Sequence, residues 1–175
     1  MLWHVLQGVA KAKTVDDIWV VTDSEEVKEG AESWGVKALM TRPDCPSGTA
    51  RIASVIEQLR ADTVINVQGD EPLIAGEVID LVAGSLEGSK AQVATPVFRI
   101  SDAQDVNNPN LVKVVRDADG RALYFSRSPI PYVRDVEPAE WLSAAHFWGH
   151  VGVYAYRRQV LADFEKYPEG RLEAA

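Results

Sequence analysis

Hydrophobic positions in the first half of the chain follow two alternating patterns. Short, largely apolar runs at 18–21, 36–40 and 64–67 have the length and composition of buried strands. The segments around them repeat hydrophobic residues every three or four positions, as the buried stripe of a helix does. These stripes are Leu2, Val5, Leu6 and Val9; Val27, Ala31 and Trp34; Ile52, Val55, Ile56 and Leu59; and Val78, Ile79, Leu81 and Val82. Strands that alternate with helices in this way predict an α/β fold with a mainly parallel sheet.

Polar residues at the edges of these segments predict where helices begin. Thr22 with Glu25 has the spacing of a capping box, and Ser101 with Gln104 has the same spacing. A further helix is expected to begin near Ser47.

The second half of the chain has a different pattern, with strand signals at 92–100, 111–115, 122–125 and 151–156. Residues 117–120 read Asp-Ala-Asp-Gly, which is typical of a hairpin turn. We therefore expect an antiparallel hairpin inserted into the parallel fold. Because no repeat, low-complexity tract or linker interrupts the pattern, residues 1–175 are expected to form a single domain.

Composition narrows the functional classes. The chain of 175 residues is 46% hydrophobic and has a net charge of −8, so it offers no basic stripe for nucleic acid. The single cysteine, Cys45, excludes an internal disulfide and suits a reducing cytoplasm. No apolar run approaches the roughly 20 residues that span a bilayer. A helical pattern is already under way at Leu2 and another starts at 171–175, so we expect an internal piece of a longer protein.

The segment 64–72 carries the first chemical candidate. Its apolar run, expected to be a buried parallel strand, stops at Gly69, Asp70 and Glu71. Ligands of α/β sheets bind at the carboxyl ends of such strands, and carboxylates suit a divalent cation. Gly69 would allow a tight turn or a close approach to a ligand. The alternative is an acidic turn that binds nothing.

The segment 41–51 carries the second candidate, an ordered loop that leads into a helix N-terminus. Backbone N–H groups there bind anions or carbonyls, and Ser47 and Thr49 add hydroxyls. Arg51 lies in the first turn, where the helix dipole disfavours a cation, so an external acceptor is expected for it. The alternative is that Ser47 only caps the helix and Arg51 is a solvated charge.

Two further candidates lie in the second half. Arg127, at a strand end and followed by two prolines, could clamp a carboxylate, although a plain surface arginine is the alternative. A two-residue period places His150, Gly152 and Tyr154 on one strand face, where they could accommodate the hydroxyls of a ligand. The alternative for this pair is a half-buried histidine beside a core tyrosine.

The ordered set of these segments resembles the cytidylyltransferases that activate 3-deoxy-D-manno-octulosonate (Kdo), the CMP-Kdo synthetases. The likeness covers nearly the whole chain and rests on the ordered set, because a turn such as 68–72 also suits other sugar nucleotidyltransferases. The matching segments are 41–44 with 47–49 and Arg51, 66–72, 108–110 with 112–115, 122–127 with 129–131, and 150–156.

This resemblance implies a Rossmann-like nucleotidyltransferase fold and a magnesium-dependent reaction in which CTP and Kdo give CMP-Kdo and diphosphate. It implies a cytoplasmic enzyme of lipopolysaccharide synthesis, a homodimer, and no nucleic-acid or membrane partner. By the same likeness, Asp70 would hold Mg²⁺ with Glu71 secondary, and Asp70 and Arg127 would be catalytic. The implied nucleotide contacts are Ser47, Gly48, Thr49, Arg51 and Gln68, and the implied sugar contacts are Gln68, Arg127, His150 and Tyr154.

The chain also departs from the family pattern. The family begins with a first strand and a loop rich in glycine and arginine that grips the triphosphate, and both are missing before Met1. A Glu-Gln pair near the sugar and a second metal-binding Asp are expected beyond Ala175. Cys45 replaces a usual histidine, and Ala50 replaces an acidic residue whose loss is expected to loosen Arg51. Two alternatives therefore stay open: a catalytically silent fragment, or an enzyme for another acidic sugar such as sialic acid or 8-amino-Kdo.

Overall fold

The computed structural model describes residues 1–168 and 170, which fall into two compact units. The first unit comprises Met1–Ala94 together with the returning segment from Val153, and the second comprises Thr95–Gly152. The expectation of a single domain stays a prediction. The helix expected at 171–175 lies outside the described residues.

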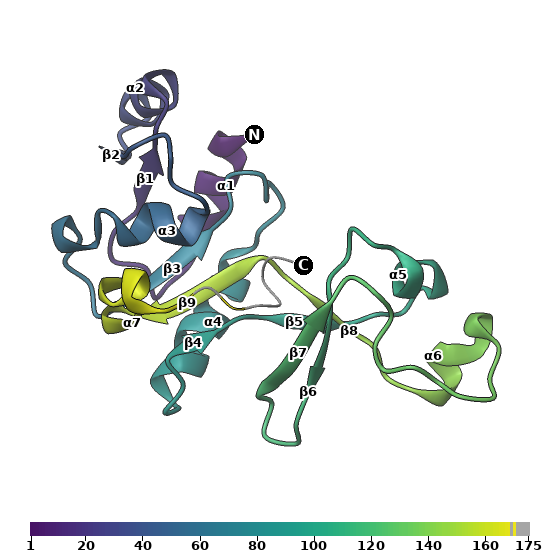
Figure 1. Cartoon of the computed structure of the whole chain (residues 1–175). Coiled ribbons are helices and arrows are strands. Elements are labelled where there is room, and N and C mark those ends of the chain that lie inside the picture. The colour runs from purple at the N-terminus through teal and green to yellow at the C-terminus, as the bar shows by residue number, and fades with distance from the viewer. Residues whose placement is uncertain (169, 171–175) are drawn as a thin grey trace. The chain divides into compact units, whose positions relative to one another are not determined.

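The first unit contains a parallel pair of strands, β1 (Trp19–Thr22) and β2 (Lys37–Met40), covered by α2 (Glu25–Ser33) (Figure 1). Residues on α1 (Leu2–Val9), β1 and α2 form its core, as the hydrophobic stripes predict: Leu6, Val20 and Ala31. The N-cap of α2 is Ser24, whose Oγ accepts a hydrogen bond from the N–H of Val27 at 3.3 Å. The predicted cap at Thr22 is therefore wrong by two residues, because Thr22 still belongs to β1.

The other sheet of the first unit has the strand order β3 (Thr63–Val67), β9 (Val153–Arg157), β4 (Val93–Ala94). β9 is antiparallel to both neighbours, so β3 and β4 run in the same direction. The α/β class is confirmed, but the pairing is less parallel than predicted. Among the described strands, β1 and β2 form the only parallel hydrogen-bonded pair. The strands β3 and β4 run in the same direction but do not pair with each other, because the antiparallel strand β9 lies between them.

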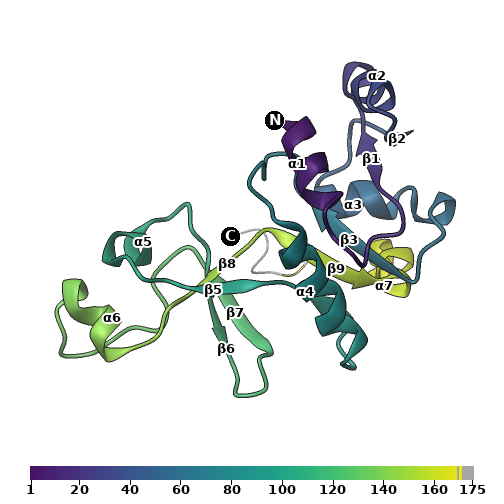
Figure 2. The ribbon, with the colours of Figure 1, turned by 180° about the vertical axis from the view of Figure 1, so that it is seen from behind.

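Helices cover both faces of this sheet. On one face lies α4 (Gly76–Glu87) (Figure 2), and its Val82 and Leu86 pack with Ala155. On the other face lie α3 (Gly48–Ala53), the 3₁₀ turn Ile56–Gln58 and α7 (Arg158–Ala162), followed by a 3₁₀ turn at Phe164–Lys166. The core of that second face is formed by Ile56, Leu59, Tyr156 and Leu161.

A close approach fixes α1 against the start of α4. A Cβ placed on Gly8 would lie 2.2 Å from the Ile74 carbonyl oxygen, and one placed on Gly76 would lie 2.6 Å from the Ala12 nitrogen. Both positions therefore need glycine for packing, because any side chain would force the backbones apart.

The second unit is a sheet of four antiparallel strands in the order β5 (Val97–Arg99), β8 (Trp148–His150), β6 (Lys113–Arg116), β7 (Ala122–Ser126). The predicted hairpin is confirmed as β6 and β7, with Gly120 at a φ of 85° in its turn.

Short helices complete the second unit. α5 (Ala103–Asn107), the 3₁₀ turn Pro138–Glu140 and α6 (Trp141–Ala144) surround a small core. The buried residues of that core are Ile100, Val106, Trp141 and Phe147. α5 is capped by Asp102, one residue after the predicted Ser101, because the Asp102 carboxylate accepts the Gln104 N–H at 2.8 Å.

Two further expectations concern a first strand of the family's sheet and a membrane-spanning helix. Among the described residues β1 pairs with β2 and β3 pairs with β9. These pairings do not test the first strand that the family resemblance implies, so that strand stays a prediction. No helix in the part of the chain that the structure describes is long and apolar enough to cross a membrane.

Candidate functional site

Polar side chains gather where α3 begins beside β3 and β9. Ser47 caps α3, and its Oγ accepts the N–H of Ala50 at 3.1 Å. The Thr49 hydroxyl lies 3.1 Å from the Tyr156 hydroxyl, and the Asn66 amide nitrogen donates to it at 3.5 Å. The predicted nucleotide loop is therefore tied directly to the strands beneath it.

Gln68 belongs to the same cluster. Its amide nitrogen donates to the Asn66 side-chain oxygen at 3.5 Å. A Cβ placed on Gly48 would lie 3.5 Å from both polar atoms of the Gln68 amide. Glycine at this position therefore leaves the space in front of Gln68 open, and the structure brings Ser47, Gly48, Thr49 and Gln68 together.

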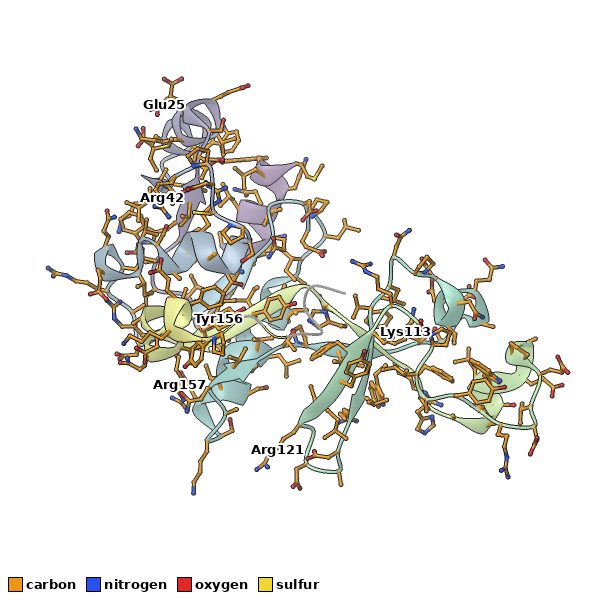
Figure 3. All side chains as sticks on the ribbon, viewed as in Figure 1. Glu25, Arg42, Lys113, Arg121, Tyr156 and Arg157 are labelled. Atoms are coloured by element: carbon orange, nitrogen blue, oxygen red, sulfur yellow. The ribbon has the colours of Figure 1, made fainter. Side chains whose placement is uncertain are left out.

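Sequence reasoning missed Asn66 and Tyr156, which hold this cluster in place through their contacts with Thr49 and Gln68. Figure 3 labels Tyr156. Asn66 is 4% exposed and Tyr156 is 8% exposed. Burial raises the pKa of Tyr156, against a lowering by the Thr49 hydrogen bond, so its phenol is neutral. A signal for Asn66 was present, because an amide in the middle of an apolar strand must find a partner when it is buried.

Arg51 has its acceptors inside the protein. One Nη1 donates to the Thr41 Oγ1 at 2.5 Å and to the Arg42 carbonyl at 3.3 Å, and it lies 3.2 Å from an Asp23 carboxylate oxygen. The helix dipole led us to expect an acceptor outside the protein for Arg51, but the structure provides acceptors within the protein instead. Asp23 supplies a carboxylate to Arg51, and the expected loosening by Ala50 stays a prediction. The part of Arg51 in nucleotide binding stays a prediction.

The acidic turn follows β3 directly. The Glu71 N–H donates to the Gln68 carbonyl at 3.2 Å, Asp70 is exposed and Glu71 is half-buried. β3 is itself only half-buried and is paired with an antiparallel strand, which corrects the expectation of a buried parallel strand. A Cβ on Gly69 would meet only Leu2 Cδ1, at 3.9 Å, so the turn does not require glycine for packing.

The donor set at this turn fits one kind of metal site. Among the described residues no group of three or more acidic, histidine or cysteine side chains could hold a metal ion alone. Mg²⁺ characteristically binds through one or two carboxylates and completes its shell with water and substrate phosphates. An exposed Asp70 with Glu71 beside it fits that arrangement.

In the second unit, Arg127 is exposed and its Nη1 donates to the Pro109 carbonyl at 2.9 Å. His150 ends β8, and its ring lies edge-on to Phe125 with centroids 5.1 Å apart. Burial lowers the pKa of the His150 imidazole below its ordinary value of 6.5, so the ring is neutral at pH 7.

A threonine lies within hydrogen-bond distance of His150. The Thr95 Oγ1 lies 2.8 Å from the His150 Nε2 and donates to the Val151 carbonyl at 3.1 Å. A hydroxyl has one hydrogen to donate, so when Thr95 donates it to the Val151 carbonyl, the Nε2 of His150 is the donor to Thr95. Sequence reasoning missed Thr95, which lies far from His150 along the chain.

The structure assigns His150 and Tyr154 to different strands. Regular strand geometry stops at 151–152, so His150 belongs to β8 in the second unit and Tyr154 to β9 in the first. The prediction that they share one strand face is therefore wrong. Tyr154 lies opposite Asn66 in the β3–β9 register and stacks on Tyr156 with centroids 6.0 Å apart. Of the predicted sugar contacts, Gln68 and Tyr154 lie in the first unit, and Arg127 and His150 lie in the second.

Comparison with known proteins places this geometry in a family. A sequence model described as Cytidylyltransferase matches residues 1–175. The 3-deoxy-manno-octulosonate cytidylyltransferase of Francisella tularensis subspecies novicida is 43% identical over 99% of this chain and 70% of its own length. The enzyme of the same name from Escherichia coli is 42% identical over 100% of this chain and 69% of its own length.

A solved structure agrees with these relatives. It is that of CMP:2-keto-3-deoxy-manno-octonic acid synthetase complexed with CTP, and it superposes with a TM-score of 0.90 at 38% sequence identity. The superposition covers 99% of this chain and 69% of that one. The chain belongs to the 3-deoxy-manno-octulosonate cytidylyltransferase family.

Proposed function

We propose that the protein transfers the cytidylyl group of CTP to Kdo. The anomeric hydroxyl oxygen of the sugar forms a bond to the α-phosphorus, the bond from that phosphorus to the β-phosphate bridging oxygen breaks, and diphosphate leaves. The hydroxyl proton passes to solvent, so the products are CMP-Kdo and diphosphate. The observation that carries the proposal is the likeness of nearly the whole chain to a synthetase complexed with CTP.

We assign nucleotide binding to Ser47, Gly48, Thr49, Arg51 and Gln68. Hydrogen bonds with Tyr156 and Asn66 hold Thr49, and Gly48 leaves open space before the Gln68 amide. The loop is therefore preorganised before the nucleotide arrives, which lowers the entropic cost of orienting the reacting phosphate.

We assign the metal to Asp70, with Glu71 as a secondary ligand. Bound Mg²⁺ would offset the charge that the phosphates carry and develop in the reaction. Asp70 is exposed on a turn that immediately follows Gln68, so its carboxylate is available to an ion that arrives with the nucleotide. Because the described residues hold no group of three or more acidic, histidine or cysteine side chains that could bind the ion alone, water and the phosphates of the substrate would complete its shell.

We assign the acidic sugar to Arg127, His150, Tyr154 and Gln68. The guanidinium of Arg127 supplies the positive charge that a sugar carboxylate requires. His150 and Tyr154 are neutral at pH 7, because burial lowers the pKa of the former and raises that of the latter. These rings are suited to hydrogen bonds with sugar hydroxyls. We assign the catalytic roles to the charged residues, Arg127 through the sugar carboxylate and Asp70 through the metal ion.

We further propose a cytoplasmic enzyme of lipopolysaccharide synthesis that works as a homodimer. The dimer is supported by β7, an edge strand of the second unit's sheet on which Leu123 is 66% exposed and Tyr124 is 50% exposed. Exposed apolar side chains on an unpaired strand edge are a typical surface for a second copy.

The test is a turnover assay that follows diphosphate release from CTP, Mg²⁺ and Kdo. We expect turnover with Kdo, and sialic acid in place of Kdo measures the choice of sugar. Asp70→Asn should reduce turnover by orders of magnitude, because loss of the metal removes several kcal/mol of charge stabilisation. The control is Asp119→Asn, an exposed acid in the turn between β6 and β7.

Absence of turnover by the unaltered protein with any acidic sugar would contradict the proposal and favour a catalytically silent chain. Normal turnover by Asp70→Asn at saturating Mg²⁺ would contradict the metal assignment alone.

A further inference from the structure

Lys113 on β6 is a buried charge for which the proposed reaction has no direct use. The residue is 0% exposed. Figure 3 labels its side chain. The Nζ donates to the Asn108 carbonyl at 2.8 Å and to the Leu111 carbonyl at 2.7 Å. Across the residues that the structure describes, the ion pairs include no carboxylate partner for it.

An ammonium group in this place is costly. Burial, and after it the positive charge of Arg127, lowers the pKa of Lys113. An apolar side chain of similar length would fill the position without that cost, because a buried charge loses its hydration. The two carbonyl contacts recover part of the loss, so the role of Lys113 should be sought in the segment that carries those carbonyls.

That segment is the turn at 108–111, which lies between α5 and β6. Within the turn, the Leu111 N–H donates to the Asn108 carbonyl at 3.2 Å, and the Asn110 N–H donates to the Asn108 Oδ1 at 3.0 Å. Lys113 therefore binds a carbonyl at each end of the turn.

Arg127 binds the same turn between those two points, because the Pro109 carbonyl accepts its Nη1 at 2.9 Å. The β6–β7 register pairs Lys113 with Ser126, the residue before Arg127. The Pro109 carbonyl, in a turn that Lys113 holds from inside the unit, thus binds the guanidinium of Arg127. Without this contact the exposed Arg127 side chain would sample several rotamers.

We propose that Lys113 is a positioning residue for Arg127. Its ammonium fixes the 108–111 turn, the turn presents the Pro109 carbonyl to one edge of the guanidinium, and the opposite edge meets the carboxylate of the acidic sugar. The inference rests on the proposed function only in naming that carboxylate. The link from Lys113 through the turn to Arg127 is a property of the second unit alone.

Kinetics of two variants test the link. Lys113→Met removes both the charge and the donors, and should raise the KM for the acidic sugar about tenfold while leaving the KM for CTP unchanged. Lys113→Gln keeps N–H donors without the charge, and should raise the sugar KM only about threefold. Lys90→Met, at an exposed lysine of the first unit, is the control and should change neither constant. Equal increases in both KM values would overturn the inference.

A double-mutant cycle with Arg127→Ala separates positioning from general structural support. If Lys113 acts through Arg127, Lys113→Met should change the sugar KM less than about twofold once Arg127 is already alanine. Additive effects of the two substitutions would contradict the inference, since a purely structural lysine would weaken the unit whether or not Arg127 were present.

A chemical probe decides the matter without any turnover. Phenylglyoxal modifies free guanidinium groups, and peptide mass spectrometry reports the rate at Arg127. We expect Lys113→Met to raise this rate several-fold and Lys90→Met to leave it unchanged. If the unaltered protein converts no acidic sugar, the proposed function fails while this rate still tests the link. Equal rates at Arg127 in the unaltered protein and in Lys113→Met would overturn the inference.

Discussion

The aromatic and imidazole side chains proposed to contact the sugar are all uncharged at neutral pH. Burial raises the pKa of Tyr154, to which its neighbour Tyr156 adds, and burial lowers the pKa of His150. Hydrogen bonding to hydroxyls needs no charge, whereas a carboxylate needs a cation. Selection for an acidic sugar should therefore depend on Arg127, and the tyrosine and histidine should tune which neutral groups of the sugar are accepted.

The pKa of His150 predicts how stability depends on pH. The unfolded chain takes up a proton near the ordinary pKa of 6.5, whereas the folded chain keeps His150 neutral to lower pH because its pKa is lowered. Between these two pKa values the unfolded state binds more protons, so the free energy of unfolding should fall as the pH drops below 6.5. Urea unfolding at a series of pH values measures this slope, which His150→Gln should reduce.

His146→Gln provides the control for that measurement, because His146 is an exposed histidine of the same unit. An unchanged slope in His150→Gln, or an equal reduction in both variants, would show that the buried imidazole is not the group responsible.

At the scale of elements, local patterns predicted the strands and helices better than their partners. The runs at 18–21 and 64–67 became β1 and β3, and Asp-Ala-Asp-Gly became the turn between β6 and β7. The position of β9 between β3 and β4 depends on where a distant segment returns, which hydrophobic spacing does not encode. The predicted N-caps differ from the observed ones by one or two residues, because each of several neighbouring polar residues could have capped the helix.

The candidate site follows the same division. Ser47, Gly48, Thr49 and Gln68 were predictable because they lie at the end of a strand or the start of a helix. Asn66, Tyr156 and Thr95 were missed because their partners come from other elements. His150 and Tyr154 were wrongly joined, because a two-residue period holds only while the strand continues, and it breaks at 151–152.

Two glycines in helices predict opposite effects of the same substitution. Gly8→Ala should destabilise the protein by about 1–3 kcal/mol, because overpacking displaces backbone and the new Cβ would lie 2.2 Å from the Ile74 carbonyl oxygen. Gly84→Ala, inside α4, should stabilise by about 0.5–1 kcal/mol, because alanine favours helix and nothing lies within 4 Å of its Cβ. Thermal unfolding of both variants measures the difference, and equal changes in the two would contradict the close approach of α1 to Ile74.

At the scale of the whole molecule, net charge and proposed substrates have the same sign. The chain carries −8, and CTP and Kdo are anions, so long-range attraction should not guide them to the protein. Recognition must then come from a few cations at short range. The proposed role of the buried Lys113 in positioning Arg127 agrees with this. Mg²⁺ would add to this positive charge when it arrives with the nucleotide.

The oligomeric state can be tested on the edge strand β7. Leu123 is 66% exposed there, and a second copy covering this strand would bury it. Leu123→Glu would place two carboxylates against a two-fold related copy, because a symmetric interface repeats every substitution. We therefore expect the unaltered protein to have the mass of a dimer by light scattering, and Leu123→Glu to have the mass of a monomer at the same concentration. Leu73→Glu is the control, since Leu73 is 92% exposed but lies in the acidic turn of the first unit. A monomeric unaltered protein would overturn the dimer, and a dimer in both variants would place its interface away from β7.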